Sequence, residues 1–218
     1  MAEHEEKKKL VDPEALVKAL DWLYEKAIGN VDNVSGCWQL ADDYLQKYNH
    51  DPELAAKKMV IAQVAKCTTS GFLTSLGGLI TLPVAIPVNI TSVWYVQLQM
   101  IATIAVMGGY NPTHDEVKTL CYTCLTGTGV ADALKQGGVQ FAVRGGKVAI
   151  EKIPTEVLKA VNKRLGMRFV TKFGEKGIVN LGKMIPVLGG VVGGGFDYAS
   201  TSIIAHKAIK TFIKNEID

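Results

Sequence analysis

The amino-acid sequence predicts an all-α fold: one multi-helix domain in which an uncharged helical hairpin is buried and packs with a glycine-rich helical hairpin. Apolar residues recur three and four positions apart along much of the chain, which is the period of an amphipathic helix. The pairs Asp12-Pro13 and Asp51-Pro52 each place a capping carboxylate before a proline at the first helical position. No stretch alternates polar and apolar residues between hairpin turns, so we expect no β-sheet.

Length and composition fit one domain with a substantial core. The chain has 218 residues, of which 48% are hydrophobic and 21% are charged, as in ordinary folded proteins. We expect residues 1–10 to form a flexible charged tail and residues 11–218 to form a single domain. Within it, residues 11–66 are predicted to form amphipathic helices, and residues 67–214 a glycine-rich apolar core region.

Three amphipathic helices are predicted in the N-terminal part. The first begins at Asp12-Pro13, carries leucines at helical spacing and ends at Gly29, a residue type that favours helix C-termini. The second begins near Ser35. The third begins at Asp51-Pro52 and runs to about Thr69.

The middle of the chain is uncharged, because no Asp, Glu, Lys or Arg occurs between Lys66 and Asp115. Two prolines and a Gly-Gly pair divide this stretch into a front piece, 71–86, and a helix over about 88–106. Proline ends or kinks helices because it lacks a backbone donor and its ring clashes with the preceding turn.

The residues of the uncharged helix leave two environments open. A helix over 88–108 would be about 31 Å long, enough to cross a bilayer core. Its aliphatic residues favour insertion by about 2.5–5 kcal/mol, but its unpaired amides cost a few kcal/mol each, so the sum is near zero. Its polar residues form a stripe at helical spacing that suits a partner helix or a wet cleft: Asn89, Ser92, Gln99 and Thr103. The helix is therefore either the hidden core of a helical domain or in contact with lipid.

Further helices are predicted towards the C-terminus: about 114–126, a segment over 130–150, one from near Thr155, and a last one over about 198–214. Gly-rich turns alternate with apolar runs before the last helix. Four glycines there are spaced in pairs four apart, as in a glycine zipper, where two helix backbones approach closely: Gly189, Gly190, Gly193 and Gly194. We expect this run to pack against the segment 71–109.

Positive charge is concentrated in residues 144–183, which hold ten basic and three acidic residues although the whole chain carries only +3. An apolar stripe in the helix from Thr155 leaves its basic residues as candidates for contact with anionic lipid headgroups: Lys159, Lys163, Arg164, Arg168, Lys172 and Lys176. The alternative is a surface helix whose basic face is merely solvated.

Signatures of catalysis, of a metal site and of a cofactor site are missing from the sequence. Cys121 and Cys124 form a CxxC without a second pair or a spaced histidine, so we expect two buried thiols. The basic region has no interleaved aromatic residues that would indicate nucleic-acid binding. The charged N-terminus has no apolar signal region, and four cysteines suit a reducing compartment. We therefore expect a cytoplasmic protein, peripheral to the inner face of the cell membrane.

Two separated motifs, GFLTSLGGLITLPVAIPVNITSVWYVQLQMIATIAVMGGY and VTKFGEKGIVNLGKMIPVLGGVVGGGFD, resemble the EcsC protein family. The resemblance runs from about Lys66 to Ile213. The family is named for a bacterial protein encoded beside the two components of an ABC transporter linked to secretion, and its biochemical activity is undefined. The resemblance implies an all-helical domain in a bacterial, membrane-linked setting, with a transporter complex as a partner. It implies no catalytic residues.

These observations favour a non-enzymatic, membrane-associated or lipid-binding protein. Its apolar hairpins would insert into or enclose lipid, while the 144–183 region meets anionic headgroups. The alternative is a soluble helical interaction module that is accessory to a transporter or a larger assembly. A hydrolase is a distant third, because only a polar cluster around Asn89 and Gln99 would support it.

Overall fold

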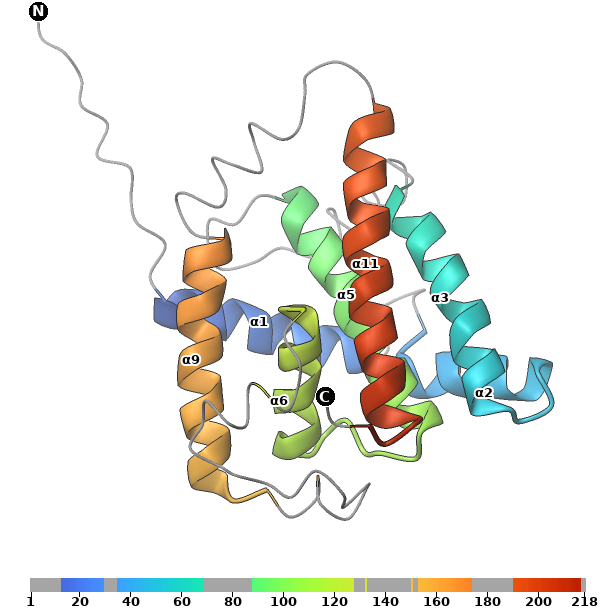
Figure 1. Ribbon diagram of the computed structural model, residues 1–218, viewed down its shortest axis with the longest axis horizontal. Helices are drawn as coiled ribbons and strands as arrows, with labels where there is room; N and C mark the ends of the chain where they lie inside the picture. The colour runs from blue at the N-terminus through green and yellow to red at the C-terminus, as the bar shows by residue number, and fades with distance from the viewer. Residues whose placement is uncertain are drawn as a thin grey trace, which may run out of the picture.

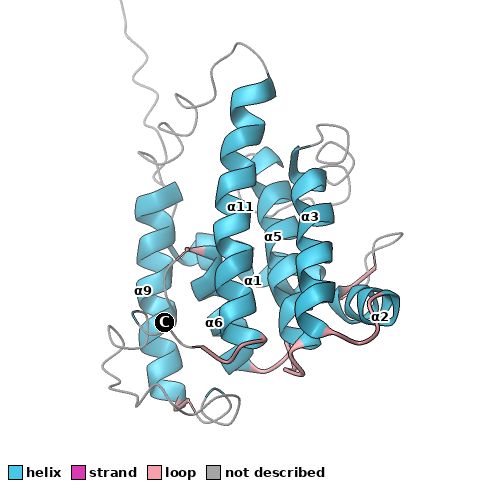
Figure 2. Ribbon diagram, turned by 45° about the vertical axis from the view of Figure 1, so that its right-hand side comes forward, coloured by secondary structure: helices cyan, strands magenta, loops and turns pink. Residues whose placement is uncertain are grey.

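The computed structural model describes residues 13–29, 35–68, 88–127, 132, 150, 153–173 and 190–216, and these residues contain helices and loops but no strand (Figure 2). The predicted all-α class is confirmed. The helices are α1 (Pro13–Ile28), α2 (Cys37–Lys47), α3 (Pro52–Thr68), α5 (Val88–Met107), α6 (Asp115–Leu125), α9 (Thr155–Phe173) and α11 (Gly190–Phe212).

Helix α5 is the centre of the fold. It packs against α1, α2, α3, α6 and α11 (Figure 1). Every residue from Trp94 to Ala105 is buried. A helix without a charged side chain can be enclosed in this way, because no face of it requires water.

Three contacts fix the relative directions of α3, α5 and α11. Gln97 of α5 donates a hydrogen bond to Thr201 of α11 over 3.0 Å, and Gly108 beyond α5 lies against the carbonyl of Phe212. In both pairs the residue of α11 follows its partner by 104 positions. Because the separation is the same at two points along the helices, α5 and α11 run parallel. The 3.4 Å ion pair between Lys214 and Glu53 shows that α3 runs antiparallel to α11.

Helix α9 lies at one edge of the molecule, where it packs on α1 and α6 (Figure 1). Leu158, Val161 and Leu165 are buried on its inner side. Their spacing is the apolar stripe predicted from the sequence, and the helix continues through Gly166. Its C-terminal end points in the same direction as the N-terminal ends of α5 and α11 (Figures 1 and 2).

The predicted helix boundaries are accurate where capping residues mark them. The Asp51 carboxylate accepts hydrogen bonds from the backbone N–H groups of Glu53 and Leu54, each over 3.0 Å, as expected of an N-cap. The second helix begins at Cys37 after an extended Gly36, slightly later than predicted.

The predicted start of the last helix, near residue 198, is wrong. Helix α11 already begins at Gly190, so the glycine run from Gly190 and the last predicted helix form one continuous helix. Glycine costs about 1 kcal/mol relative to alanine inside a helix, a local preference that tertiary packing can outweigh.

Several predicted features lie outside the described residues: the tail 1–10, the front piece 71–86, most of 130–150, and Gly189. The described part of the two predicted hairpins is the pair of parallel helices α5 and α11, which contact each other.

Candidate functional site

One end of the helical bundle collects the ends of three helices. Because α3 runs antiparallel to α5 and α11, its last residue, Thr68, lies at the same end as Val88 and Gly190, the first residues of α5 and α11 (Figure 1). We call this end the junction end. The chain that connects Thr68 to Val88 contains no charged residue, and the sequence before Gly190 reads IPVLG.

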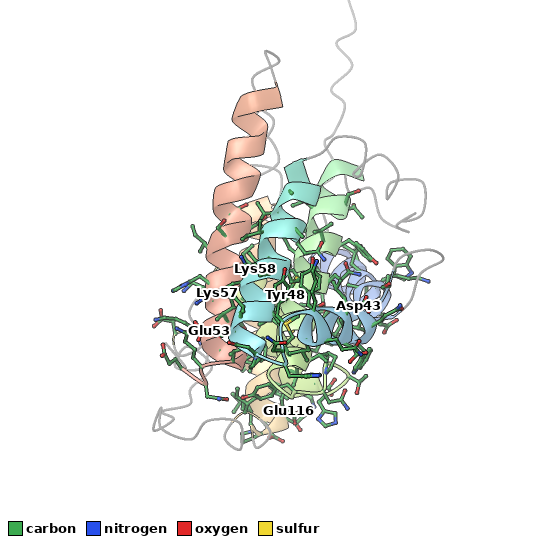
Figure 3. The ribbon with its side chains drawn as sticks, turned by 90° about the vertical axis from the view of Figure 1, so that its right-hand side faces the viewer. Asp43, Tyr48, Glu53, Lys57, Lys58 and Glu116 are labelled. Carbon is green, nitrogen blue, oxygen red and sulfur yellow. The ribbon has the colours of Figure 1, made fainter. Side chains whose placement is uncertain are left out.

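Acidic residues gather towards the opposite end. Figure 3 shows Asp43, Glu53 and Glu116 in the half of the molecule away from the junction end. The Glu53 carboxylate forms ion pairs with the ammonium groups of Lys57, at 2.7 Å, and Lys214, at 3.4 Å. Hydrogen bonds from these two lysines hold the pKa of the Glu53 carboxyl below its usual value. Lys210 likewise lies 3.7 Å from Glu216, so acidic and basic residues are mixed at this end.

The predicted basic face is partly described. Lys159, Lys163 and Arg164 are exposed on α9. Arg168 and Lys172 lie within α9, but their side chains are outside the description, as is the whole of Lys176. Lys159 and Lys163 are one helical turn apart, so their ammonium groups emerge on the same side of the helix.

The predicted polar stripe is buried inside the protein. Ser92 and Thr103 are 0% exposed and Gln99 is 3% exposed, whereas the side chain of Asn89 is outside the description. Gln99 donates hydrogen bonds to the backbone carbonyl of Ser35 over 2.8 Å and to the Tyr95 hydroxyl over 3.4 Å. Thr103 donates to the carbonyl of Gln99 over 2.7 Å. Gln99 thus contacts the segment before α2, and the role predicted for the stripe as a whole stays a prediction.

Two close contacts were not predicted. The Gln97–Thr201 hydrogen bond joins α5 to α11, and Gly108 approaches the Phe212 carbonyl too closely for a Cβ atom to fit. A polar residue such as Gln97 in an otherwise apolar helix was the one sequence feature that could have indicated the hydrogen bond to α11. Gly190, Gly193 and Gly194 lie in the first turns of α11, and their predicted close-packing role stays a prediction.

A cavity of about 260 Å³ lies between α1, α6 and α9. Its apolar walls come from Val17, Leu20, Leu158 and Leu165. Residues with hydrogen-bond donors and acceptors complete the lining: Asp21, Asp115, Lys118, Thr119, Tyr122, Thr155, Lys159 and Asn162. Lys159 thus belongs both to the cavity and to the exposed basic face.

An ordered ion pair forms one side of the cavity. Oδ1 of Asp21 accepts from the Lys118 ammonium at 2.7 Å and from the Tyr122 hydroxyl at 2.8 Å. The same ammonium lies 5.7 Å from the ring centre of Tyr24 and 5.9 Å from that of Tyr122, within cation–π range. Burial, followed by the nearby Asp21 carboxylate, raises the pKa of Tyr122, so this hydroxyl stays protonated and donates.

Asn162 supplies an unsatisfied group. Its side-chain oxygen Oδ1 is buried and accepts no hydrogen bond in the described structure. Leaving such a group unpaired costs about 1–3 kcal/mol. Sequence reasoning missed Asn162 because a single asparagine on a basic amphipathic helix gives no signal of what three converging helices place around it.

The buried thiols are unsuited to nucleophilic chemistry. Cys37, Cys121 and Cys124 are each 0% exposed, as predicted for the CxxC pair. Burial raises the pKa of the Cys37 and Cys124 thiols to about 12 and that of Cys121 well above its usual value. A thiol that stays protonated at neutral pH is a poor nucleophile. Within the described ranges, no three His, Cys, Asp or Glu side chains gather as metal ligands would.

A comparison with protein-family models gives a match to the EcsC protein family over residues 39–214, which is most of the chain. The chain belongs to this family. The EcsC match begins within α2, earlier than the motifs quoted above, and leaves α1 outside. No curated protein and no solved structure gives a significant match. Among the helices that the structure describes in this EcsC protein, none is both long and apolar enough to cross a bilayer.

Proposed function

We propose that this EcsC protein is a non-enzymatic protein that binds peripherally to anionic membranes. The observation that carries the proposal is the convergence of α3, α5 and α11 at the junction end, where an uncharged connecting sequence begins and ends. An apolar, uncharged sequence that joins these helix ends would gain free energy by leaving water.

Charge supports the same orientation. Each Lys or Arg near an anionic membrane surface contributes about 1 kcal/mol of attraction. Lys159, Lys163 and Arg164 are exposed in the N-terminal half and middle of α9, and Arg168 and Lys172 follow in the part that runs towards the junction end. Anionic headgroups would repel Glu116 at the opposite end. The two effects together favour a membrane-bound state with the junction end towards the bilayer.

An exposed aliphatic side chain on α3 adds apolar contact. Ile61 is 65% exposed, although isoleucine is usually buried, and it lies about two helical turns from the junction end of α3. Fully burying such a side chain is worth about 1.5–3 kcal/mol, so even its partial insertion would contribute to binding.

Vesicle flotation tests the proposal. We expect the protein to float with vesicles that contain 30% phosphatidylserine or phosphatidylglycerol (an assay composition on the order of cytoplasmic-leaflet charge), to remain unbound with pure phosphatidylcholine, and to dissociate at high salt. The double substitution K163E/R164E should lower the vesicle affinity at least about tenfold, because it reverses two charges near the surface.

The substitution pair K57E/K58E on α3 is a matched control, since it makes the same change in net charge at exposed positions away from α9. It should retain more binding than K163E/R164E. Equal loss in both variants would contradict a specific role of α9. Absence of flotation with every anionic vesicle would refute the proposal and favour a helical interaction module.

A further inference from the structure

We propose that copies of this protein associate head to tail, with α2 of one copy docked on α11 of the next. The inference goes beyond membrane binding and does not depend on it, because it concerns two faces in the half of the bundle away from the junction end. Each face combines an exposed large hydrophobic side chain with charge, and the two charges have opposite signs. Trp38 is 44% exposed on α2, and Ile203 is 56% exposed on α11.

Helix α2 presents an acidic face, which we define as Trp38, Asp42 and Asp43. Asp42 lies one helical turn from Trp38, so both side chains emerge on the same side of the helix, and Asp43 is exposed beside them. Apart from one hydrogen bond to a glutamine of the same helix, neither carboxylate has a charged partner among the described residues. Lys47, one turn beyond Asp43, instead lies 5.8 Å from the ring centre of Tyr48. The two carboxylates are therefore available to a second molecule.

Helix α11 presents a basic face around an open groove of about 340 Å³. We define this face by the residues that line the groove: Ser202, Ile203, His206, Lys207 and Lys210. All the polar side chains in this set can donate a hydrogen bond, and none of them is a carboxylate. Lys210 already lies 3.7 Å from Glu216, so Lys207 is the principal cation that the face offers. Such a groove suits an acidic helix that also carries an apolar side chain.

The two faces belong to different sides of the molecule. Helix α3 packs against both α2 and α11 and lies between them in Figures 1 and 2. A contact between the acidic face and the basic face therefore joins two copies. Because two different surfaces meet, the interface is heterologous, and its repetition extends a row of copies or closes a ring.

Both faces lie at a similar height along the bundle. Ile203 is level with Gln99 of α5, since paired residues of α5 and α11 are 104 positions apart. Gln99 in turn donates to the backbone carbonyl of Ser35, just before α2, over 2.8 Å. Figures 1 and 2 show α2 beside the half of α11 away from the junction end. Copies that stand side by side with their junction ends on a bilayer thus bring an acidic face next to a basic face.

The strength of the contact follows from its composition. Tryptophan is one of the residue types that most often anchor an interface, and here it can pack against the exposed Ile203. Complementary charges around such an anchor add orientation and speed of association more than affinity. Since the two faces are small, we expect a transient contact with a dissociation constant between about 1 µM and about 1 mM.

Sedimentation velocity over this concentration range, without lipid, tests the proposal. The sedimentation coefficient of the wild type should rise with concentration, and less so at about 1 M salt, which screens the charges. Trp38→Ala and Ile203→Asp should each raise the dissociation constant at least about tenfold. Ile61→Asp is the matched control, because it makes the same substitution at another exposed isoleucine. It should leave self-association unchanged, and an equal loss in Ile61→Asp and Ile203→Asp would contradict the assignment of the faces.

Reversing the charges identifies the pairing directly. D42K/D43K makes both faces of a copy basic, and K207E/K210E makes both faces acidic, so neither variant should associate with itself. An equimolar mixture of the two should associate as the wild type does, because every contact again joins opposite charges. Thermal melting checks that both variants fold. If K207E/K210E does not fold, Lys207→Glu takes its place, because it keeps the ion pair between Lys210 and Glu216.

The outcomes separate this proposal from membrane binding. A wild type that stays monomeric at every concentration, or charge-reversed variants that stay apart when mixed, would overturn self-association and leave vesicle flotation unaffected. Association that stops at a dimer would replace the head-to-tail contact by a two-fold one. Ile61→Asp should weaken vesicle binding alone, and Ile203→Asp self-association alone.

Discussion

Gly108 shows how a single residue can determine whether two helices meet. It lies just beyond α5, and a Cβ atom at this position would overlap the backbone carbonyl of Phe212 at the end of α11. Backbone cannot rotate away as a side chain can. We therefore expect Gly108→Ala to lower the free energy of unfolding by about 1–3 kcal/mol, the usual cost of overpacking. Urea denaturation measures the change, and an unaltered midpoint would show that the ends of α5 and α11 separate easily.

The buried thiols make stability depend on alkaline pH. Burial raises the pKa of Cys37 and Cys124 from 9.0 to about 12 in the folded protein, whereas in the unfolded chain they ionise near 9. The unfolded state therefore loses protons first, and this contribution to stability is present below pH 9 and lost as the pH rises towards 12.

We expect the urea midpoint to fall between pH 9 and pH 11 more steeply in the wild type than in the variant Cys37→Ala/Cys124→Ala. Substituting both thiols lowers stability at every pH, so the slope against pH is the informative quantity. Buried tyrosines with raised pKa values, such as Tyr24, add a common background to both proteins. Parallel slopes would mean that the two thiols already ionise alike in the folded and unfolded states.

At the scale of elements, α5 and α11 are joined by a buried polar link. Gln97 is 4% exposed and Thr201 is 0% exposed, and the amide of the first donates to the hydroxyl of the second. Thr201→Val leaves that amide without an acceptor, which should cost about 1–3 kcal/mol of stability. Adding Gln97→Met removes the stranded amide and should restore part of the loss. A double-mutant cycle by urea denaturation gives the coupling, and additive effects would argue against the link.

The positions of helices could be predicted from the sequence where capping residues or an apolar stripe mark them. Asp51 and Pro52 fix the start of α3 whatever its neighbours are, and the apolar stripe of α9 fixes which side is buried. The start of α11 was missed because glycines disfavour helix locally, so its extension depends on packing that a linear pattern does not encode. The cavity was missed for a related reason. Asp21, Tyr122 and Asn162 lie on three helices, and their proximity exists only after folding.

At the scale of the whole molecule, the proposed membrane binding implies an orientation. The uncharged sequence between Thr68 and Val88 joins two helix ends that lie at the junction end, while Glu116 lies towards the other end. An anionic bilayer would attract the exposed basic residues of α9 even before contact. Salt screens this attraction, because the Debye length falls from about 10 Å at 0.1 M to about 3 Å at 1 M.

A fluorescent label can read out the resulting orientation. We would attach the label to a cysteine introduced as Ala65→Cys, an exposed position near the junction end of α3, or as Glu116→Cys at the opposite end, in a Cys67→Ser background. The described native thiols are buried and protonated, so they should react slowly. Brominated lipid in anionic vesicles should quench the label at position 65 strongly and the label at position 116 weakly, because quenching requires contact with acyl chains. Comparable quenching at both positions would mean that the protein binds without a fixed orientation, and stronger quenching at 116 would reverse the proposed orientation.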